Sequence, residues 1–228
     1  NVEIKEDAAV LDEVIITAEE SKKVDLRTPQ MSVAKLSINE IKKIPVVLGE
    51  VDLIKSIQLL PGVANAGEGA SGFNVRGGAE DQNLILLDEA IIYNASHLFG
   101  FFSVFNADAI KDVKLYKGGI PAQYGGRASS ILDVKMKEGN SKKLEINGGI
   151  GVIFSRFSIE APIVKDKASF IFAARRSYID ILAKPFLTGN NANAAFNFYD
   201  LTAKVNYNIN AKNTVFLSGY FGRDVFGT

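Results

Sequence analysis

The sequence contains no cysteine, and that absence removes several kinds of chemistry. Without a thiol the chain forms no disulfide, no cysteine-based catalytic site and no Cys-ligated zinc site. The only histidine is His97. A lone histidine is more often a structural hydrogen-bonding residue than a metal ligand, so the sequence predicts neither a metal site nor a cofactor.

Net charge and long apolar runs are absent as well. Twenty-six basic and 26 acidic residues give a formal net charge of zero, which does not indicate a nucleic-acid partner. The sequence contains no run of about 18 apolar residues, so it predicts no transmembrane helix. Residues 1–7 lack the basic start and the apolar stretch of a signal peptide.

The motifs of common enzyme classes are also missing. No Gly-Lys-Ser/Thr follows a glycine loop, and no Gly-x-Ser-x-Gly elbow is present. Residues 67–72 fit the spacing G-x-G-x-x-G of dinucleotide-binding proteins. That fingerprint needs a preceding strand and a following helix, whereas Pro61-Gly62 ends a helix before it and Phe73 to Arg76 is strand-like after it. An enzyme is therefore the least supported class.

The first 140 residues combine short helices with short strands, which is typical of a compact α+β domain. Ser37 and Glu40 form a capping-box pattern that opens a short helix, which Pro45 ends. A second helix is predicted over residues 50–60, before Pro61-Gly62. Strands are predicted at residues 73–76, 84–87, 113–116 and 131–136.

After residue 140 the apolar residues recur with a period of two. In residues 199–210 one face carries Tyr199, Leu201, Ala203, Val205, Tyr207 and Ile209, and the other carries only polar residues. This alternation is long enough for a strand of a transmembrane barrel. We expect strands to start near residues 143, 156, 167, 198 and 214, joined by alternately short and long connections.

Three segments in a fixed order carry a family resemblance. They are Asn74-Val75-Arg76-Gly77, Ile85-Leu86-Leu87-Asp88 and the stretch from Tyr124-Gly125-Gly126 to Leu132. Together they resemble the plug domain of TonB-dependent outer-membrane receptors of the Bacteroidetes type. The resemblance implies an α+β plug, with a short mixed sheet and short helices, followed by antiparallel transmembrane strands. Because about five strands cannot enclose such a plug, the barrel is expected to be incomplete in this chain.

The structural residues of these motifs are expected to be Arg76, Gly77, Asp88, Tyr124, Gly125 and Gly126. Arg76 and Asp88 close the ends of two strand-like runs, so they are predicted to form a partly buried pair that pins two plug strands. Glu89-Ala90 follows Asp88 where the family often has glycine, and a changed turn is expected there.

The resemblance also predicts the domain organisation. Residues 1–10 would be the tail of a β-sandwich-like extension, 11–23 the TonB box and linker, 24–140 the plug, and 141–228 the first barrel strands. The box would pair with an edge of the sheet of TonB. An ordinary edge strand is the alternative interpretation. The box residues are Leu11, Asp12, Glu13, Val14, Ile15, Ile16, Thr17 and Ala18.

The function implied by the resemblance is active transport in the outer membrane, with the plug and the N-terminus facing the periplasm. The implied partners are TonB, outer-membrane lipid and an imported siderophore, vitamin, glycan or peptide. The resemblance does not decide whether a surface lipoprotein also covers the receptor as a lid. Loop positions suggest Asn65, Tyr93, Asn94 and His97 as residues near the substrate. The alternative is that these loops only pack against the barrel wall and do not contact substrate.

The competing function is a non-enzymatic soluble periplasmic or surface interaction module. The strands after residue 140 discriminate between the two functions. If their apolar faces pack on another layer of the chain, the soluble module is correct; if those faces point to lipid, the receptor is correct.

Overall fold

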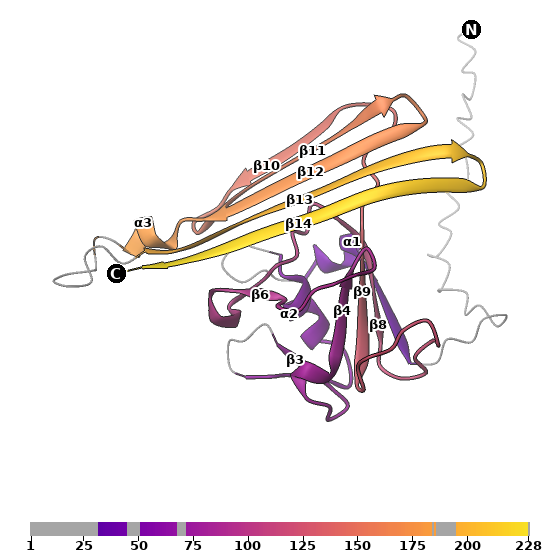
Figure 1. Cartoon of the computed structure of the whole chain (residues 1–228). Coiled ribbons are helices and arrows are strands. Elements are labelled where there is room, and N and C mark those ends of the chain that lie inside the picture. Colours follow the sequence, from indigo (N-terminus) through magenta and orange to yellow (C-terminus); the bar gives the residue numbers. More distant parts are fainter. Residues whose placement is uncertain (1–31, 45–50, 68–71, 184, 186–194, 228) are drawn as a thin grey trace, which may run out of the picture. The chain divides into compact units, whose positions relative to one another are not determined.

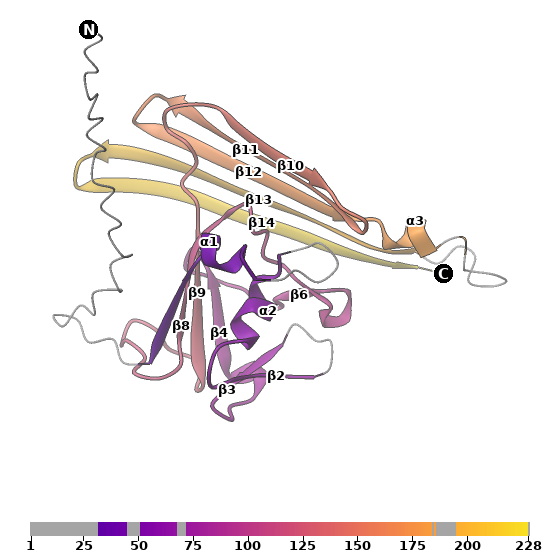
Figure 2. The same ribbon diagram turned by 180° about the vertical axis from the view of Figure 1, so that it is seen from behind.

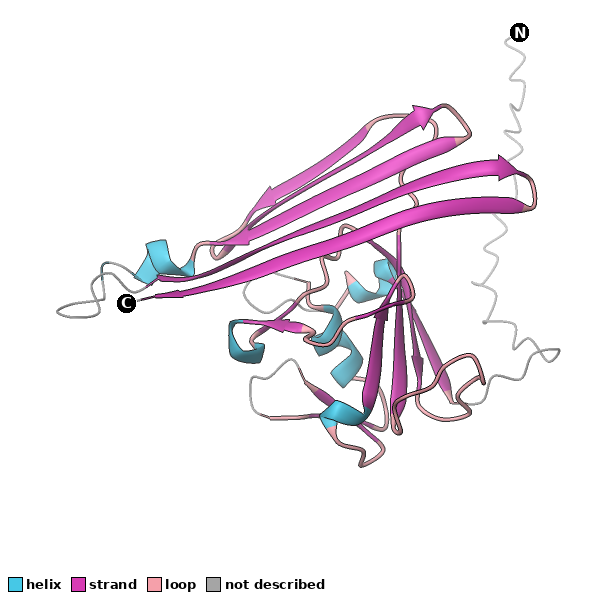
Figure 3. Cartoon of the chain, viewed as in Figure 1, coloured by secondary structure: helices cyan, strands magenta, loops and turns pink. Residues whose placement is uncertain are grey.

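The computed structural model describes residues 32–44, 51–67, 72–183, 185 and 195–227, which all belong to one compact unit. The predicted TonB box and the segment before it lie outside the described residues. Two five-stranded sheets dominate the structure, and Figures 1 and 3 show them as separate groups of strands.

The first sheet has the strand order β1-β8-β9-β4-β5. Its strands are β1 (Val33–Ser37), β8 (Ile110–Tyr116), β9 (Ser130–Met136), β4 (Asn83–Leu87) and β5 (Ala90–Ile91). β4 and β9 run parallel and the other neighbours run antiparallel, so the sheet is mixed, as predicted. The central strands β4 and β9 are almost fully buried, which explains the apolar run Leu84–Leu87 in β4. β9 also buries the polar residues Ser130 and Asp133.

Two short helices cover one face of this sheet, as the view from behind in Figure 2 shows. In α1 (Ile38–Ile41) the capping box of Ser37 and Glu40 is present, as predicted. α2 (Leu53–Gln58) is shorter than expected because the carboxylate of Asp52 accepts a hydrogen bond from Lys55 N and fixes the first turn. Ile54 and Ile57 then pack into a core shared with the sheet.

Shorter elements connect these parts. They are β2 (Val63–Asn65), β3 (Phe73–Val75), β6 (Ser96–His97), β7 (Phe102–Ser103), α3 (Ile179–Ala183) and two 3-10 helices, η1 (Glu80–Gln82) and η2 (Leu98–Gly100). β3 pairs with β2, outside the main sheet. Gly62, in the turn before β2, has a φ of 78°, a conformation that glycine adopts without steric cost.

The second sheet is an antiparallel meander in chain order, and its edges do not meet. It comprises β10 (Glu145–Ile150), β11 (Phe154–Val164), β12 (Ala168–Ser177), β13 (Ala195–Asn210) and β14 (Asn213–Gly227). The five strands predicted after residue 140 are therefore confirmed, each starting within a few residues of the expected position.

The two faces of this second sheet differ in an unusual way. On β13 the polar side chains of Asp200, Thr202, Lys204 and Asn206 are buried, with exposed fractions between 0% and 6%. The alternating apolar residues Leu201, Val205, Tyr207 and Ile209 are 38–56% exposed. The buried polar side chains contact the α+β domain, and we call the opposite side of the sheet its apolar face. Among the described helices, none combines the length and the apolar character needed to cross a membrane.

Candidate functional site

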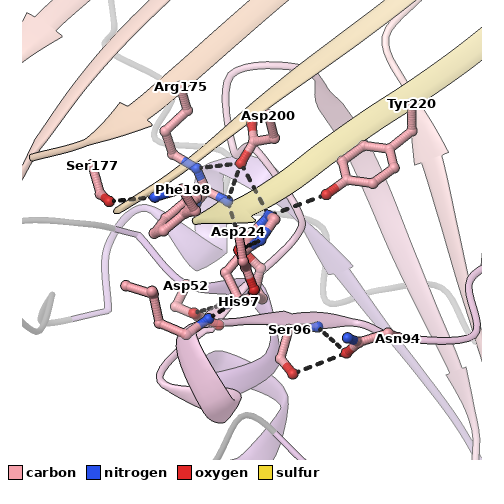
Figure 4. A network of polar contacts seen from close by, with 12 residues as sticks. Asp52, Asn94, Ser96, His97, Arg175, Ser177, Phe198, Asp200, Tyr220 and Asp224 are labelled. Atoms are coloured by element: carbon pink, nitrogen blue, oxygen red, sulfur yellow. Dashed lines mark hydrogen bonds and ion pairs between the residues drawn. The ribbon is translucent and has the colours of Figure 1, made fainter. Parts of the chain in front are cut away.

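A buried arginine lies at the centre of the contact between the second sheet and the α+β domain (Figure 4). Arg175 on β12 donates from Nε and Nη2 to Oδ2 of Asp200 on β13, at 2.9 and 2.7 Å. The same Nη2 donates to the carbonyl of Ser103 on β7, at 2.7 Å. Both side chains of this ion pair are fully buried. One guanidinium therefore joins two strands of the second sheet to the backbone of the α+β domain.

His97 on β6 reaches the same cluster from the α+β domain. Its Nδ1 lies 2.6 Å from Oδ1 of Asp224 on β14, and its Nε2 lies 3.1 Å from the hydroxyl of Tyr220 and 3.5 Å from Oδ2 of Asp200. The ring stacks on Phe198 with 4.3 Å between centroids. Asp224 also accepts a hydrogen bond from Leu98 N. Both ring nitrogens are thus engaged by residues of the second sheet.

Asp52 links this cluster to the first turn of α2. One carboxylate oxygen caps the helix, and the other accepts from Ser103 N at 2.8 Å. Ser103 is therefore held on its amide by Asp52 and on its carbonyl by Arg175. Any displacement of β7 away from the second sheet would break a contact to a fully buried charge.

A second group of polar contacts lies further along β13. Lys204 Nζ lies 2.8 Å from Oδ2 of Asp88, whose other oxygen accepts from Met136 N. Lys137 pairs with Glu160 on β11 at 2.9 Å. Ser169 Oγ and Asn206 Nδ2 both donate to the carbonyl of Glu138, each at 2.7 Å. Charged and hydrogen-bonded groups thus recur along the contact, which also contains two apolar clusters, one with Phe102 and Phe198 and one with Ala109 and Ile171.

Such an interface has a definite energetic character. Buried ion pairs recover little net stability because both charges lose their hydration, but removing one partner leaves an unpaired buried charge. The contact is thus specific while it is intact. If the two parts separate, water can hydrate every exposed group. No cluster of potential metal ligands occurs within the part of the chain that the structure describes.

The predicted pair of Arg76 and Asp88 is wrong. Arg76 is exposed, and its Nη2 donates to Ser32 Oγ at 2.8 Å. Its strand, β3, pairs with β2 and not with β4, so the two strand ends do not face each other. The carboxylate of Asp88 is turned to Lys204 and Met136 instead.

The turn after Asp88 is a two-residue connection between Leu87 and Ala90, which pair with each other. Asp88 and Glu89 have φ values of 47° and 74°, the left-handed conformation that tight hairpins require at both central positions. Of the other motif residues, Gly77 and Gly126 both have a φ of 83°, where glycine is favoured. Tyr124 donates from its hydroxyl to Asp133 at 3.3 Å.

The four predicted substrate residues do not gather in one place. Tyr93 and Asn94 line one pocket of about 410 Å³, together with Glu80, Asp81 and Arg127. Asn65 lies outside this lining, where its Oδ1 accepts from Gln58 and Gly67 N. His97 is buried in the contact with the second sheet. Tyr93 is 85% exposed, so its ring is available for contact.

Sequence reasoning missed Arg175, Asp200, Lys204 and Asp224 as interface residues. The sequence did contain one signal for this interface: Asp200 and Lys204 are charged, whereas the other residues on the polar face of residues 199–210 are neutral. The alternation indicated that these side chains share a face, but not which groups of the α+β domain they would meet.

Comparisons with known proteins agree with this architecture. The family model described as TonB-dependent Receptor Plug Domain matches residues 25–130. A search of curated proteins finds no match. The Bacteroidetes-type subgroup stays a prediction.

Several solved structures share the fold. The siderophore receptor PirA from Pseudomonas aeruginosa is 17% identical with a TM-score of 0.58, and the alignment covers 85% of this chain and 36% of that one. The PirA receptor from Acinetobacter baumannii is 18% identical with a TM-score of 0.59, covering 86% and 32%. The outer membrane transporter YddB from Escherichia coli is 14% identical with a TM-score of 0.59, covering 85% and 33%.

At these identities the structures establish the fold alone, and this chain spans about a third of their length. The aligned part extends past the α+β domain, since that domain is less than 85% of the chain. The family match shows that residues 25–130 form a domain of the TonB-dependent receptor plug family, and the shared fold agrees with it.

Proposed function

We propose that the chain is part of an active-transport receptor of the bacterial outer membrane, in which the plug closes the lumen of a β-barrel. The observation that carries this proposal is the distribution of polarity over the second sheet. Its polar face is buried against the plug, and its apolar face is exposed. This is the pattern of a barrel with a polar interior and a lipid-facing exterior.

The same observation argues against the soluble module. A soluble protein would bury the apolar face of such a sheet in a core. Here Leu217 is 78% exposed, Phe221 is 54% exposed and Val215 is 56% exposed, all on one strand. Covering them with lipid would remove a large apolar area from water at about 25 cal/mol per Å².

The connections between the strands support an orientation in the membrane. β11 and β12 are joined by residues 165–167, and β13 and β14 by residues 211–212, both short and polar. At the opposite end, β10 and β11 are joined by residues 151–153, and the connection from β12 to β13 is longer and contains α3. Outer-membrane barrels have short turns on the periplasmic side and longer loops outside. The proposed arrangement places the plug's N-terminal side toward the periplasm.

For the substrate, we assign contacts to Tyr93 and Asn94 in the plug pocket. The pocket carries charges of both signs, from Glu80, Asp81 and Arg127, and it suits a polar ligand with donors and acceptors. Siderophores, vitamins, glycans and peptides all meet this description. Among the proteins of similar fold, PirA is a siderophore receptor and OprC is a copper transporter. His97 has a different role in this proposal, which is to hold the plug against the strands.

TonB would engage the segment Leu11 to Ala18 by adding it to an edge of its own sheet. Force on this segment would pull the plug away from the strands. A polar interface suits that motion, because each charged group that separates is stabilised by water.

Uptake by whole cells tests the proposal. Ile15→Pro removes a backbone donor from the coupling segment and should abolish energised uptake while substrate still binds at the cell surface. Ser21→Pro, in the charged linker, is the control and should preserve both. Normal uptake by the Ile15→Pro receptor would exclude residues 11–18 as the coupling segment. Loss of surface binding together with uptake would indicate a folding defect, which outer-membrane fractionation detects.

A further inference from the structure

Two exposed arginines lie in one row across the apolar face of the second sheet. Strand register pairs Ser155 with Arg176, Arg176 with Tyr199, and Tyr199 with Arg223, so the row crosses four strands. Both arginines are exposed. Their chain neighbours Arg175 and Asp224 contact the plug, and alternation along the strands therefore directs Arg176 and Arg223 to the opposite face.

The row marks one end of an apolar band. The next row toward the short turns consists of Phe157, Ala174, Leu201 and Phe221, and three further rows in register contain no charged residue. The band ends at Tyr207, eight residues from Tyr199, which is about 26 Å along a strand. Tyrosines at both ends match the aromatic girdles at the two surfaces of a membrane. The arginines thus lie at the headgroup level, on the side of the longer connection.

Among the described residues, no acidic side chain lies within ion-pair distance of Arg176 or Arg223. They flank Tyr199 on adjacent strands, about 10 Å apart. Two like charges this close at the edge of an apolar surface are stabilised by an anion between them. Guanidinium groups bind phosphate through paired hydrogen bonds, and the tyrosine hydroxyl adds a donor.

A hollow beside Arg176 indicates that the anion has an apolar part. It measures about 560 Å³ and is lined on this face by Ser155, Phe157, Ala174, Arg176, Asn197, Tyr199 and Leu201. Its charged end on this face is Arg176, and its apolar end is the first row of the band. Arg223 lies outside this lining, on the other side of Tyr199. An acyl chain can lie along the apolar end while a phosphate contacts the arginines, whereas a free phosphate would leave the apolar end uncovered.

We propose that Arg176, Tyr199 and Arg223 bind the phosphate of an anionic lipid in the outer leaflet. This inference rests on the proposed function, because it requires the apolar face to point to lipid. The ligand is a membrane lipid whose headgroup carries a net negative phosphate, and a zwitterionic lipid satisfies the arginines less well.

Native mass spectrometry of the detergent-purified receptor that contains this chain tests the site. The probe is phosphatidylglycerol, compared with phosphatidylcholine of the same acyl chains and with inorganic phosphate. The Arg176→Gln/Arg223→Gln variant should bind the first phosphatidylglycerol at least tenfold more weakly than the unmodified receptor. Lys165→Gln/Lys167→Gln removes the same charge from the exposed turn at the other end of the strands and should change binding less than twofold. Arg176→Lys/Arg223→Lys should recover part of the affinity.

Three results would overturn the lipid site: unchanged binding by the glutamine variant, equal binding of phosphatidylcholine, or equal binding of inorganic phosphate. Circular dichroism verifies that each variant is folded. Membrane fractionation distinguishes failure of the proposed lipid site from failure of the proposed receptor function. A receptor that reaches the outer membrane and binds lipid without the arginines refutes only the site, whereas one that is absent from that membrane refutes the function.

Discussion

Lys204 on β13 and Asp88 at the end of β4 form a buried ion pair, with 2.8 Å between Nζ and Oδ2. Their side chains are 6% and 1% exposed. The pair joins the second sheet to the plug through the acid of the Ile85-Leu86-Leu87-Asp88 motif. That acid therefore connects the plug to the strands, while its other oxygen accepts from Met136 N on β9, and neither contact involves Arg76.

Lys204→Met should destabilise the plug by about 3–5 kcal/mol, because Asp88 keeps a buried charge without its cation. Urea unfolding of the purified receptor, followed through the plug, measures the loss. Adding Asp88→Asn should recover most of it, since both charges are then removed. Arg76→Ala is the control at an exposed position and should change the free energy of unfolding by no more than about 0.5 kcal/mol. Equal effects of Lys204→Met and Arg76→Ala would contradict the buried pair.

Arg175→Met should make the receptor leak. The substitution leaves Asp200 without its guanidinium and releases the carbonyl of Ser103, so β7 loses its hydrogen bond to the strands and keeps only the packing of Phe102. Cells carrying this variant should become sensitive to antibiotics too large for ordinary porins, whereas cells with Lys212→Met, at an exposed turn, should not. Unchanged resistance with normal receptor abundance would show that Arg175 does not hold the seal.

Gly222→Val should displace His97. A side chain at Gly222 would first meet the hydroxyl of Tyr220 and would begin 3.0 Å from Cε1 of His97, so the tyrosine must move away from His97 Nε2 and the imidazole must shift against Asp224. Hydrogen exchange in residues 96–103 should accelerate. The control is Gly219→Val on the same strand, where a new Cβ meets no atom within 4 Å. If both variants exchange at the same rate as the unmodified receptor, His97 does not fasten this segment.

Much of the fold follows from local sequence patterns. The capping box of Ser37 and Glu40 formed because both partners lie within one turn, and the alternation in residues 199–210 fixed β13 and its two faces. These signals depend on neighbours in the chain, so the sequence reveals them directly.

The interface could not be predicted in the same way. From the sequence, Arg76 looked as suitable a partner for Asp88 as Lys204. Only the strand order excludes Arg76, because its strand β3 pairs with β2 and not with β4. His97 looked like a loop residue suited to a ligand, yet β13 and β14 enclose it with Phe198 and Asp224. Both errors concern contacts between residues distant in the chain, which depend on how the two sheets are placed.

The most direct test of the proposed receptor function is to measure whether alternate residues on β13 face lipid. The chain has no cysteine, so spin labels can be placed singly at residues 201–206 of the receptor in lipid bilayers. The account predicts high accessibility to oxygen, which dissolves in lipid, at positions 201, 203 and 205, and low accessibility at 202, 204 and 206. Labels at the odd positions that are instead reached by a water-soluble nickel reagent, or that show no alternation, would contradict a lipid-facing strand and with it the proposed transport function.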